Sequence, residues 1–248
     1  AMSAEAGIPP LGIYLHWPFC TAICPYCDFN VHAAHKNTTT QEDWLAAYCS
    51  ELTHAHGLRP HGPVKTVFLG GGTPSLMPGD LVAGILQEID RLWGLADDVE
   101  ITLEANPVSA AQVHLQELRD AGITRLSLGV QAFDDDALRF LGRTHSVNDA
   151  QHAFAAAQDI FDSASFDLIY ARPDQSLADW QKELAAALTL APQHMSLYQL
   201  TIEPGTAFYA RAQQGRLHVP DEDAAADLYE ATQSLCAAAG LPAYEVSN

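Results

Sequence analysis

Short runs of β-branched and aromatic residues alternate with longer stretches of helical periodicity along most of this chain. Such alternation is typical of repeated strand-helix units that assemble into one parallel sheet. The strand-like runs are almost continuously apolar, which indicates a sheet with both faces covered. The six predicted strands are residues 11–16, 64–69, 99–104, 123–129, 165–170 and 194–200.

Helical stretches separate these strands, and several begin or end with recognisable capping residues. A side chain that accepts a hydrogen bond from the first turn is expected at Ser109, Asp134, Ser146 and Ser176, and Gly122 follows the end of one helix. The predicted helices cover about residues 40–57, 79–93, 109–121, 134–142, 147–161, 176–190 and 221–240.

Six strand-helix units are too few to close an eight-stranded barrel. We therefore predict an α/β fold, a partial TIM-type (β/α)6 barrel over residues 11–205. Residues 1–10 are small and proline-containing and are expected to form a loose lead. A C-terminal extension is predicted to begin near residue 205, so that residues 206–248 form the start of a further region. The final residues, YEVSN, indicate that the chain continues in a larger protein.

The charge balance narrows the possible partners. The chain has 31 acidic against 12 basic residues, a formal net charge of -19. A protein with this much negative charge repels a phosphate backbone. Nucleic acid is therefore not expected as a partner. The chain contains neither a signal-like start nor an uncharged apolar window of about 18 residues. We therefore expect a cytoplasmic protein without a membrane span.

Three of the five cysteines form the pattern C-x-x-x-C-x-x-C, at Cys20, Cys24 and Cys27, directly after the first predicted strand. In a reducing compartment such a group indicates metal binding rather than disulfides. Three thiolates at these spacings can hold three irons of a cubane iron-sulfur cluster and leave the fourth without a protein ligand. Barrels of this type place their reactive site at the carboxyl ends of the strands, where this loop begins.

A structural zinc site is the alternative for these cysteines, with His16 or His32 as the fourth ligand. Zinc sites usually pair two C-x-x-C knuckles, and no second knuckle occurs in the chain. The iron-sulfur interpretation is therefore favoured. No two of the eleven histidines have the spacing H-x-x-x-H, and each of the other two cysteines is expected to be buried in a helix.

Several polar or glycine-rich positions follow the other strands. The turn GGGTPS, residues 70–75, exposes backbone groups to a close-lying ligand. Glu104 ends the third strand, where a carboxylate can bind ribose hydroxyls. Asp167 lies inside the fifth strand and requires a partner or a ligand. Gln131 follows the fourth strand and Arg143 comes twelve residues later, and we expect these groups to converge on one face.

Six segments of the chain resemble, in order, the motifs of the oxygen-independent coproporphyrinogen III oxidase family of radical S-adenosylmethionine (SAM) proteins. They are YLHWPFCTAICPYCDFN, GGGTPS, TLEANP, LGVQAFDDDALRFLGRTH, DLIYARPDQS and LYQLTIEPGT. The resemblance implies that Cys20, Cys24 and Cys27 hold a [4Fe-4S] cluster. It also implies that the amino and carboxylate groups of SAM chelate the open iron.

The same resemblance implies which residues surround the cofactor. Around a first SAM molecule they are Tyr14, Gly71 and Glu104. The enzymes of the family hold a second SAM molecule, and the positions that match its site are Tyr26, Gly72, Thr73, Gln131, Arg143, Asp167 and Thr201.

The family divides just after the third cysteine. The motif of the porphyrinogen dehydrogenases looks like C-x-x-x-C-x-x-C-x-C, whereas here Asp28 and Phe29 follow Cys27. Those enzymes also have a long N-terminal extension, whereas the first strand of this chain starts at Leu11. CPYCDFN and IEPGT are similar to the HemW-type heme chaperone branch, which binds heme and hands it to acceptor hemoproteins. The implied cargo is heme and the implied partners are acceptor hemoproteins and an electron donor. The alternative is a radical SAM enzyme acting on a porphyrinogen.

One segment departs from the family pattern. The family motif YGLPGQ is replaced by YARPDQ at residues 170–175, so that both glycines are lost. We therefore expect a loop of different shape after the fifth strand.

Overall fold

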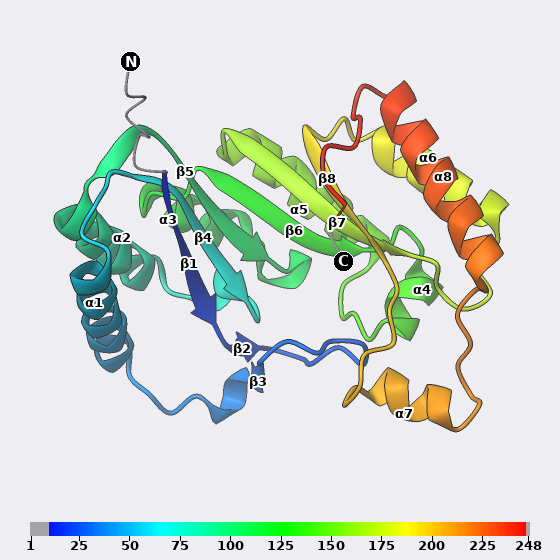
Figure 1. Cartoon of the computed structure of the whole chain (residues 1–248), viewed down its shortest axis with the longest axis horizontal. Helices are drawn as coiled ribbons and strands as arrows, with labels where there is room; N and C mark the ends of the chain where they lie inside the picture. Colours follow the sequence, from blue (N-terminus) through cyan, green and yellow to red (C-terminus); the bar gives the residue numbers. More distant parts are fainter. Residues whose placement is uncertain (1–9, 247–248) are drawn as a thin grey trace, which may run out of the picture.

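The computed structural model describes residues 10–246 and confirms the predicted α/β architecture. Nearly all of the predicted lead lies outside these residues. Six parallel strands pair in the order β1-β4-β5-β6-β7-β8, and within the described residues β1 and β8 do not pair, so the barrel stays open (Figure 1). The strands are β1 (Leu11–Trp17), β4 (Val64–Gly71), β5 (Leu95–Ala105), β6 (Arg125–Gln131), β7 (Ser163–Tyr170) and β8 (His194–Gln199).

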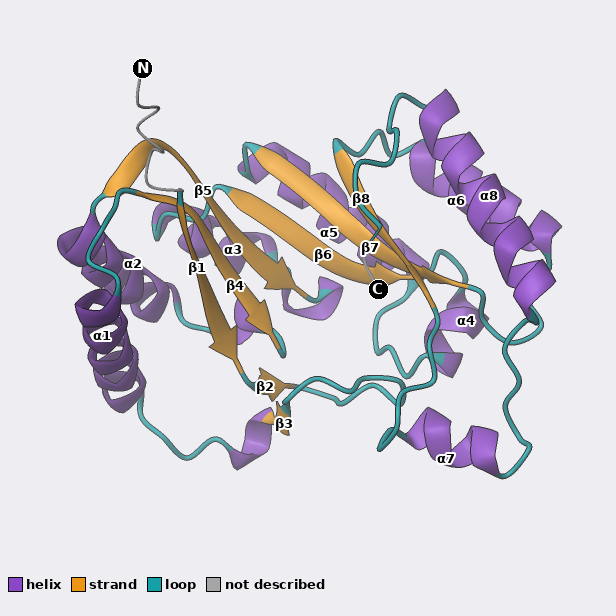
Figure 2. Ribbon diagram, in the orientation of Figure 1, coloured by secondary structure: helices purple, strands orange, loops and turns teal. Residues whose placement is uncertain are grey.

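Helices connect successive strands, and Figure 2 shows α2, α3 and α5 behind the sheet. The helices are α1 (Gln41–Leu58), α2 (Gly79–Trp93), α3 (Gln112–Asp120), α4 (Asp135–Phe140), α5 (Val147–Ile160), α6 (Leu177–Leu188), α7 (Ala207–Gln213) and α8 (Glu222–Ala238). Short 3-10 turns are η1 (Ala34–Lys36), η2 (Pro74–Leu76) and η3 (Pro107–Ser109). Two-residue strands β2 (Phe19–Cys20) and β3 (His32–Ala33) pair with each other. The short helix α7 was not predicted.

The two faces of the sheet differ in polarity, so the strands are less continuously apolar than predicted. Alternate residues are buried and apolar, among them Val67, Leu69, Leu103, Leu126 and Phe166. The residues between them carry hydroxyls or carboxylates, including Thr102, Glu104, Ser127, Ser165 and Asp167. A period of two places these groups on the opposite face, which lines the inside of the open barrel.

Most of the predicted helix ends are confirmed. The side chains of Asp134, Ser146 and Ser176 each accept a hydrogen bond from a first-turn backbone N–H. Gly122 follows α3 with φ +113°, a conformation that glycine adopts without strain.

The predicted cap at Ser109 is wrong, because α3 begins three residues later, after Ala111. The Ser109 hydroxyl instead donates to the carbonyl oxygen of Asn106 at 2.9 Å and pairs with the hydroxyl of Ser75. A short serine side chain that bonds to nearby backbone favours a turn over a helix interior. Ser109 therefore ends η3 and shapes the loop that follows β5.

The last described helix packs on the barrel. Trp180 of α6 is completely buried, and its indole N–H donates to the hydroxyl of Thr232 in α8 at 2.7 Å. The division of the chain near residue 205 remains a prediction. From Pro10 to Val246, no helix combines the length and the apolar composition needed to cross a membrane.

The loop after β7 keeps a glycine-like backbone although its glycines are absent. Ala171 and Asp174 have φ values of +55° and +60°, at the two positions where the family motif carries glycine. The loop is held by Arg172, whose guanidinium pairs with Glu183 of α6; both side chains are buried. Glu183 also accepts a hydrogen bond from the backbone N–H of Phe133 at 2.8 Å, which ties this loop to the one after β6.

Replacing Ala171 with glycine is expected to change the free energy of unfolding by less than about 1 kcal/mol. The left-handed conformation costs an L-residue about 1–2 kcal/mol, and the loss of the buried Ala171 methyl group and the extra freedom of glycine in the unfolded chain offset the gain. Urea unfolding of Ala171→Gly measures the change. As a control, Ala185→Gly on the exposed side of α6 should lower stability by about 1 kcal/mol. A loss of the same size in both variants would contradict the strain at Ala171.

Candidate functional site

The cysteine loop lies at the carboxyl ends of the strands, below β1 and β4 in Figure 1. Two backbone hydrogen bonds dock its start onto the glycine-rich turn: Gly72 donates to the Trp17 carbonyl at 2.7 Å and Thr73 to the Phe19 carbonyl at 2.8 Å. At its far end, the N–H of His32 donates to the carbonyl of Pro18 at 2.6 Å. The loop is therefore closed at its base and fixed to the sheet.

This docking explains the glycines of the GGGTPS turn. A Cβ atom on Gly72 would lie 2.6 Å from the carbonyl oxygen of Phe19. A Cβ on Gly71 would lie 2.5 Å from the His16 ring, and Gly71 has φ +111°. No side chain fits at either position, so close backbone approach requires both glycines. Their predicted contact with a ligand remains a prediction.

The three thiols of the cysteine loop influence one another. Cys20 is buried, and Cys24 and Cys27 are half-buried. Burial raises the pKa of Cys20 and the pKa of Cys27, and the charge of Cys24 raises both further. Three thiolates so close together are unfavourable by themselves, whereas metal ions that bind them stabilise the deprotonated form. The donor set therefore fits an iron-sulfur cluster.

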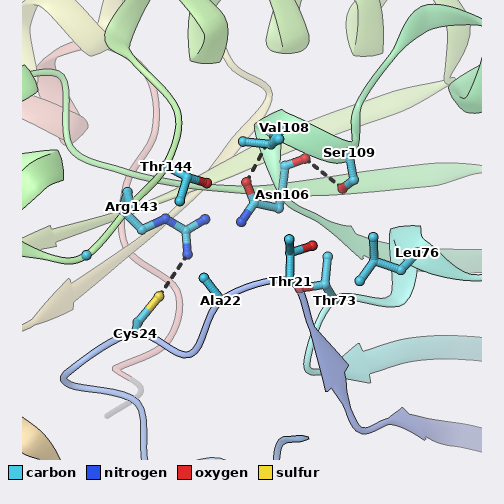
Figure 3. Close-up of a pocket in the computed structure, with 11 residues that line it drawn as sticks. Thr21, Ala22, Cys24, Thr73, Leu76, Asn106, Val108, Ser109, Arg143 and Thr144 are labelled. Atoms are coloured by element: carbon cyan, nitrogen blue, oxygen red, sulfur yellow. Dashed lines mark hydrogen bonds between the residues drawn. The ribbon is translucent and has the colours of Figure 1, made fainter. Parts of the chain in front are cut away.

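Arg143 connects this loop with β6. Its Nη1 donates to Cys24 Sγ at 3.3 Å, the contact drawn in Figure 3, and its Nη2 donates to the Gly129 carbonyl at 2.8 Å. The Nε atom of Arg143 is buried, and no group among residues 10–246 accepts its hydrogen bond. A guanidinium with an unused donor beside the cysteine loop suits an anionic or hydrogen-bond-accepting ligand.

A cavity of about 110 Å³ separates the cysteine loop from the strand ends (Figure 3). Cys24, Thr73, Asn106 and Arg143 contribute to its wall. Thr73 and Arg143 were predicted from the family motifs, and the structure brings them together at this cavity. Thr144 also lines it and was not predicted, because nothing in the sequence distinguishes this threonine from a surface residue.

Tyr14, Gly71 and Glu104, predicted around one ligand, are neighbours. The backbone N–H of Gly71 donates to Glu104 Oε2 at 3.1 Å. Burial, and secondarily the charge of Asp167, raises the pKa of Glu104 to about 7. Burial and the charge of Glu104 raise the pKa of Tyr14. A cationic group bound here would favour the ionised form of Glu104.

Asp167 lies inside the barrel among hydroxyl groups, which supply the polar partners expected for a carboxylate within a strand. Ser127 donates to its Oδ1 at 3.5 Å, and burial raises the pKa of Asp167 to about 6. Glu104 and Asp167 line a second, larger cavity of about 400 Å³ on the inner face of the sheet. The predicted residues are thus divided between two cavities.

Of the remaining predicted residues, Tyr26 and Gln131 lie near Arg143, whereas Thr201 lines neither cavity. Gln131 has a left-handed backbone, φ +73°, and its amide nitrogen lies against Gly129. Tyr26 packs against Phe208 of α7, with 6.2 Å between ring centroids. Thr201 is exposed in the loop after β8.

The larger cavity contains residues that were not predicted. Arg125, Ser127, Ser196 and Tyr198 line it together with Glu104 and Asp167. The alternation of polar and apolar residues in the strands was the signal that could have revealed this face.

Within residues 10–246, no three His, Cys, Asp or Glu side chains converge closely enough to hold one metal ion. A cubane cluster differs from a single ion in this respect, since each thiolate binds a different iron.

Known proteins with similar sequences point to one family. The model of the radical SAM superfamily matches residues 14–187. Over 253 aligned residues, the chain is 40% identical to the heme chaperone HemW of Synechocystis sp., covering 100% of this chain and 61% of the relative. It is 39% identical to the mitochondrial radical S-adenosyl methionine domain-containing protein 1 of Bos taurus, covering 99% of this chain and 55% of that protein.

The fold also resembles a solved structure. The coproporphyrinogen III oxidase HemN of Escherichia coli superposes with a TM-score of 0.79 at 26% identity, over 93% of this chain and 53% of the enzyme. The chain thus spans little more than half the length of these relatives. The family match over residues 14–187 agrees with the cysteine motif and the partial barrel, and the chain belongs to the radical SAM superfamily.

Proposed function

We propose that the protein carrying this chain is a HemW-like heme chaperone, which binds heme and transfers it to acceptor hemoproteins. The observation that carries this proposal is the sequence Cys27-Asp28-Phe29, which lacks the fourth cysteine of the porphyrinogen dehydrogenases. The 40% identity to a HemW heme chaperone over the whole chain supports it. The heme and its acceptors remain part of the proposal.

Superfamily membership implies a [4Fe-4S] cluster and SAM, and it counts against the zinc alternative. Cys20, Cys24 and Cys27 would hold the cluster, with Arg143 donating to Cys24. The bound cluster would offer an open iron to the amino and carboxylate groups of SAM and would supply one electron. An electron donor is therefore part of the proposal.

The chain's own residues would position the cofactor. Gly71 and Glu104 form one hydrogen-bonded unit beside Tyr14, and we assign a first SAM molecule to it. Thr73 and Arg143 line the small cavity next to Cys24. They would contact a second molecule together with Tyr26, Gly72, Gln131 and Asp167.

Replacing Cys24 with alanine is expected to remove the cluster, because a thiolate ligand to one iron is lost. Iron per chain after anaerobic reconstitution measures the effect. The matched control is Cys49→Ala, since Cys49 lies in α1, outside the cysteine loop, and should leave the iron content unchanged. An unaltered iron content in Cys24→Ala would refute the ligand assignment.

Heme transfer tests the proposed function itself. Full-length protein is titrated with heme and then mixed with an apo-hemoprotein, and the absorption spectrum of the acceptor is followed. We expect saturable heme binding and transfer to the acceptor. A protein that neither binds nor transfers heme would disprove the chaperone function.

The second candidate is a radical SAM enzyme acting on a porphyrinogen, favoured by the structural likeness to HemN. Anaerobic incubation with coproporphyrinogen III, SAM and reductant separates the two functions. Formation of protoporphyrinogen together with substrate-dependent 5′-deoxyadenosine would favour the enzyme, whereas a chaperone should form neither product above background.

A further inference from the structure

The floor of the larger cavity contains a cation that neither the cluster nor the assigned SAM contacts use. All six strands are parallel, so residues early in each strand lie at the opposite end of the barrel from the cysteine loop. Glu104 comes late in β5 and Asp167 lies just past the middle of β7, whereas Arg125 and His194 begin β6 and β8. The cavity of about 400 Å³ therefore has two carboxylates on the side of the cysteine loop, and its floor holds the cation Arg125 together with Glu100.

The hydrogen-bond partners of Arg125 are all neutral. Its Nη2 donates to the Ser165 hydroxyl at 2.9 Å and lies 3.4 Å from Nδ1 of His194, and its Nη1 donates to the Thr102 hydroxyl at 3.3 Å. The nearest acid, Glu100, is 4.0 Å away, too far for a hydrogen bond.

The burial of this pair is unequal. The Arg125 side chain is 14% exposed, whereas that of Glu100 is 54% exposed and well solvated. A buried guanidinium requires charged, hydrogen-bonding partners, and the two acids whose charges reach this one, Glu100 and Asp167, make no hydrogen bond with it. Its charge is therefore only partly compensated within the described residues.

His194 contacts the Arg125 guanidinium as an uncharged hydrogen-bond acceptor. Its Nε2 lies 2.8 Å from the hydroxyl of Tyr244, and its Nδ1 faces Arg125. A guanidinium has only donors, so Nδ1 accepts and the ring is the neutral tautomer that donates from Nε2. Burial, and secondarily the charge of Arg125, lowers the pKa of His194, which agrees with a neutral ring.

We propose that the floor of this cavity binds the carboxylate group of a ligand, with Arg125 as its anchor and the Ser165 hydroxyl beside it. The planar guanidinium offers paired N–H donors that match the two oxygens of a carboxylate. Glu104 and Asp167 lie further along their strands, toward the cysteine loop, and disfavour a carboxylate there. The ligand is a carboxylic acid with one carboxylate on the floor, and the part of it that faces Glu104 and Asp167 is uncharged or cationic.

This site does not depend on the proposed heme transfer. The carboxylate could belong to a small free acid, to the methionine part of a second SAM molecule that does not bind the cluster, or to a propionate side chain of a tetrapyrrole. These three sources share the same recognition chemistry, and separate titrations distinguish them.

The test is calorimetric titration of full-length protein with propionate. We expect saturable binding of propionate and none of propionamide, which has a similar shape but no charge. Arg125→Gln should weaken propionate binding about ten- to a hundredfold, since a hydrogen bond to a charged group is lost, and Arg125→Lys should weaken it less. Arg139→Gln is the matched control, because Arg139 pairs with Asp136 on the exposed surface of α4 and should bind as wild type does.

Three further titrations of the wild type and Arg125→Gln identify the source. A tetrapyrrole propionate predicts weaker binding of heme by Arg125→Gln and weaker binding of heme dimethyl ester by the wild type. The SAM carboxylate predicts that SAM binding weakens in Arg125→Gln, and a free acid predicts that only propionate binding does. Absence of saturable propionate binding, equal binding of propionamide, or unchanged propionate affinity in a folded Arg125→Gln would overturn the site. The comparison of propionate with propionamide needs only the wild-type protein. It therefore tests the carboxylate site even if the variants do not fold.

Discussion

The backbone contact between the start of the cysteine loop and the glycine-rich turn fixes the geometry of the candidate site. Gly72 and Thr73 donate to the carbonyls of Trp17 and Phe19, and side chains at Gly71 and Gly72 would collide with this segment. The contact joins the ends of β1 and β4 and holds the cysteine loop over the carboxyl end of the sheet. Cys20 then lies beside Thr73, and Gly71 presents its N–H to Glu104.

Several buried groups at this end of the barrel are unfavourable without a ligand. Burial raises the pKa values of two thiols and of the carboxyl groups of Glu104 and Asp167, and Arg143 retains an unused donor. Perturbed groups of this kind gather at functional sites, because a bound cofactor supplies the charges and hydrogen bonds that the fold lacks. The cysteine loop and the barrel interior therefore form one polar region, built for ligands rather than for stability.

The sequence predicted the order of strands and helices well, because each strand and most helices carry strong local signals. It also located the cysteine loop and the turn at residues 70–75. It failed where nonlocal packing decides the structure. Ser109 was assigned to a helix cap, yet its hydroxyl bonds to Asn106 and Ser75, and Ser75 lies far away in sequence. The short helix α7 depends on Phe208, which is buried among residues of distant segments.

The inner face of the sheet shows a different limit. Ser127, Ser165 and Asp167 alternate with buried apolar residues, but their strands contain enough apolar residues to look continuous. Arg125 was not predicted as a site residue, since a single arginine at the start of a strand looks like a surface residue. Only the parallel register of β6, β7 and β8 brings it into a cavity with Ser165 and His194.

The central claim is that the cysteine loop holds a [4Fe-4S] cluster with one iron open to SAM. Electron paramagnetic resonance of the reduced, anaerobically reconstituted protein tests it most directly. The account predicts a signal from a reduced [4Fe-4S] cluster that changes when SAM is added, because the cofactor binds the open iron. A reconstituted protein without such a signal, or with a signal that SAM leaves unchanged, would contradict it.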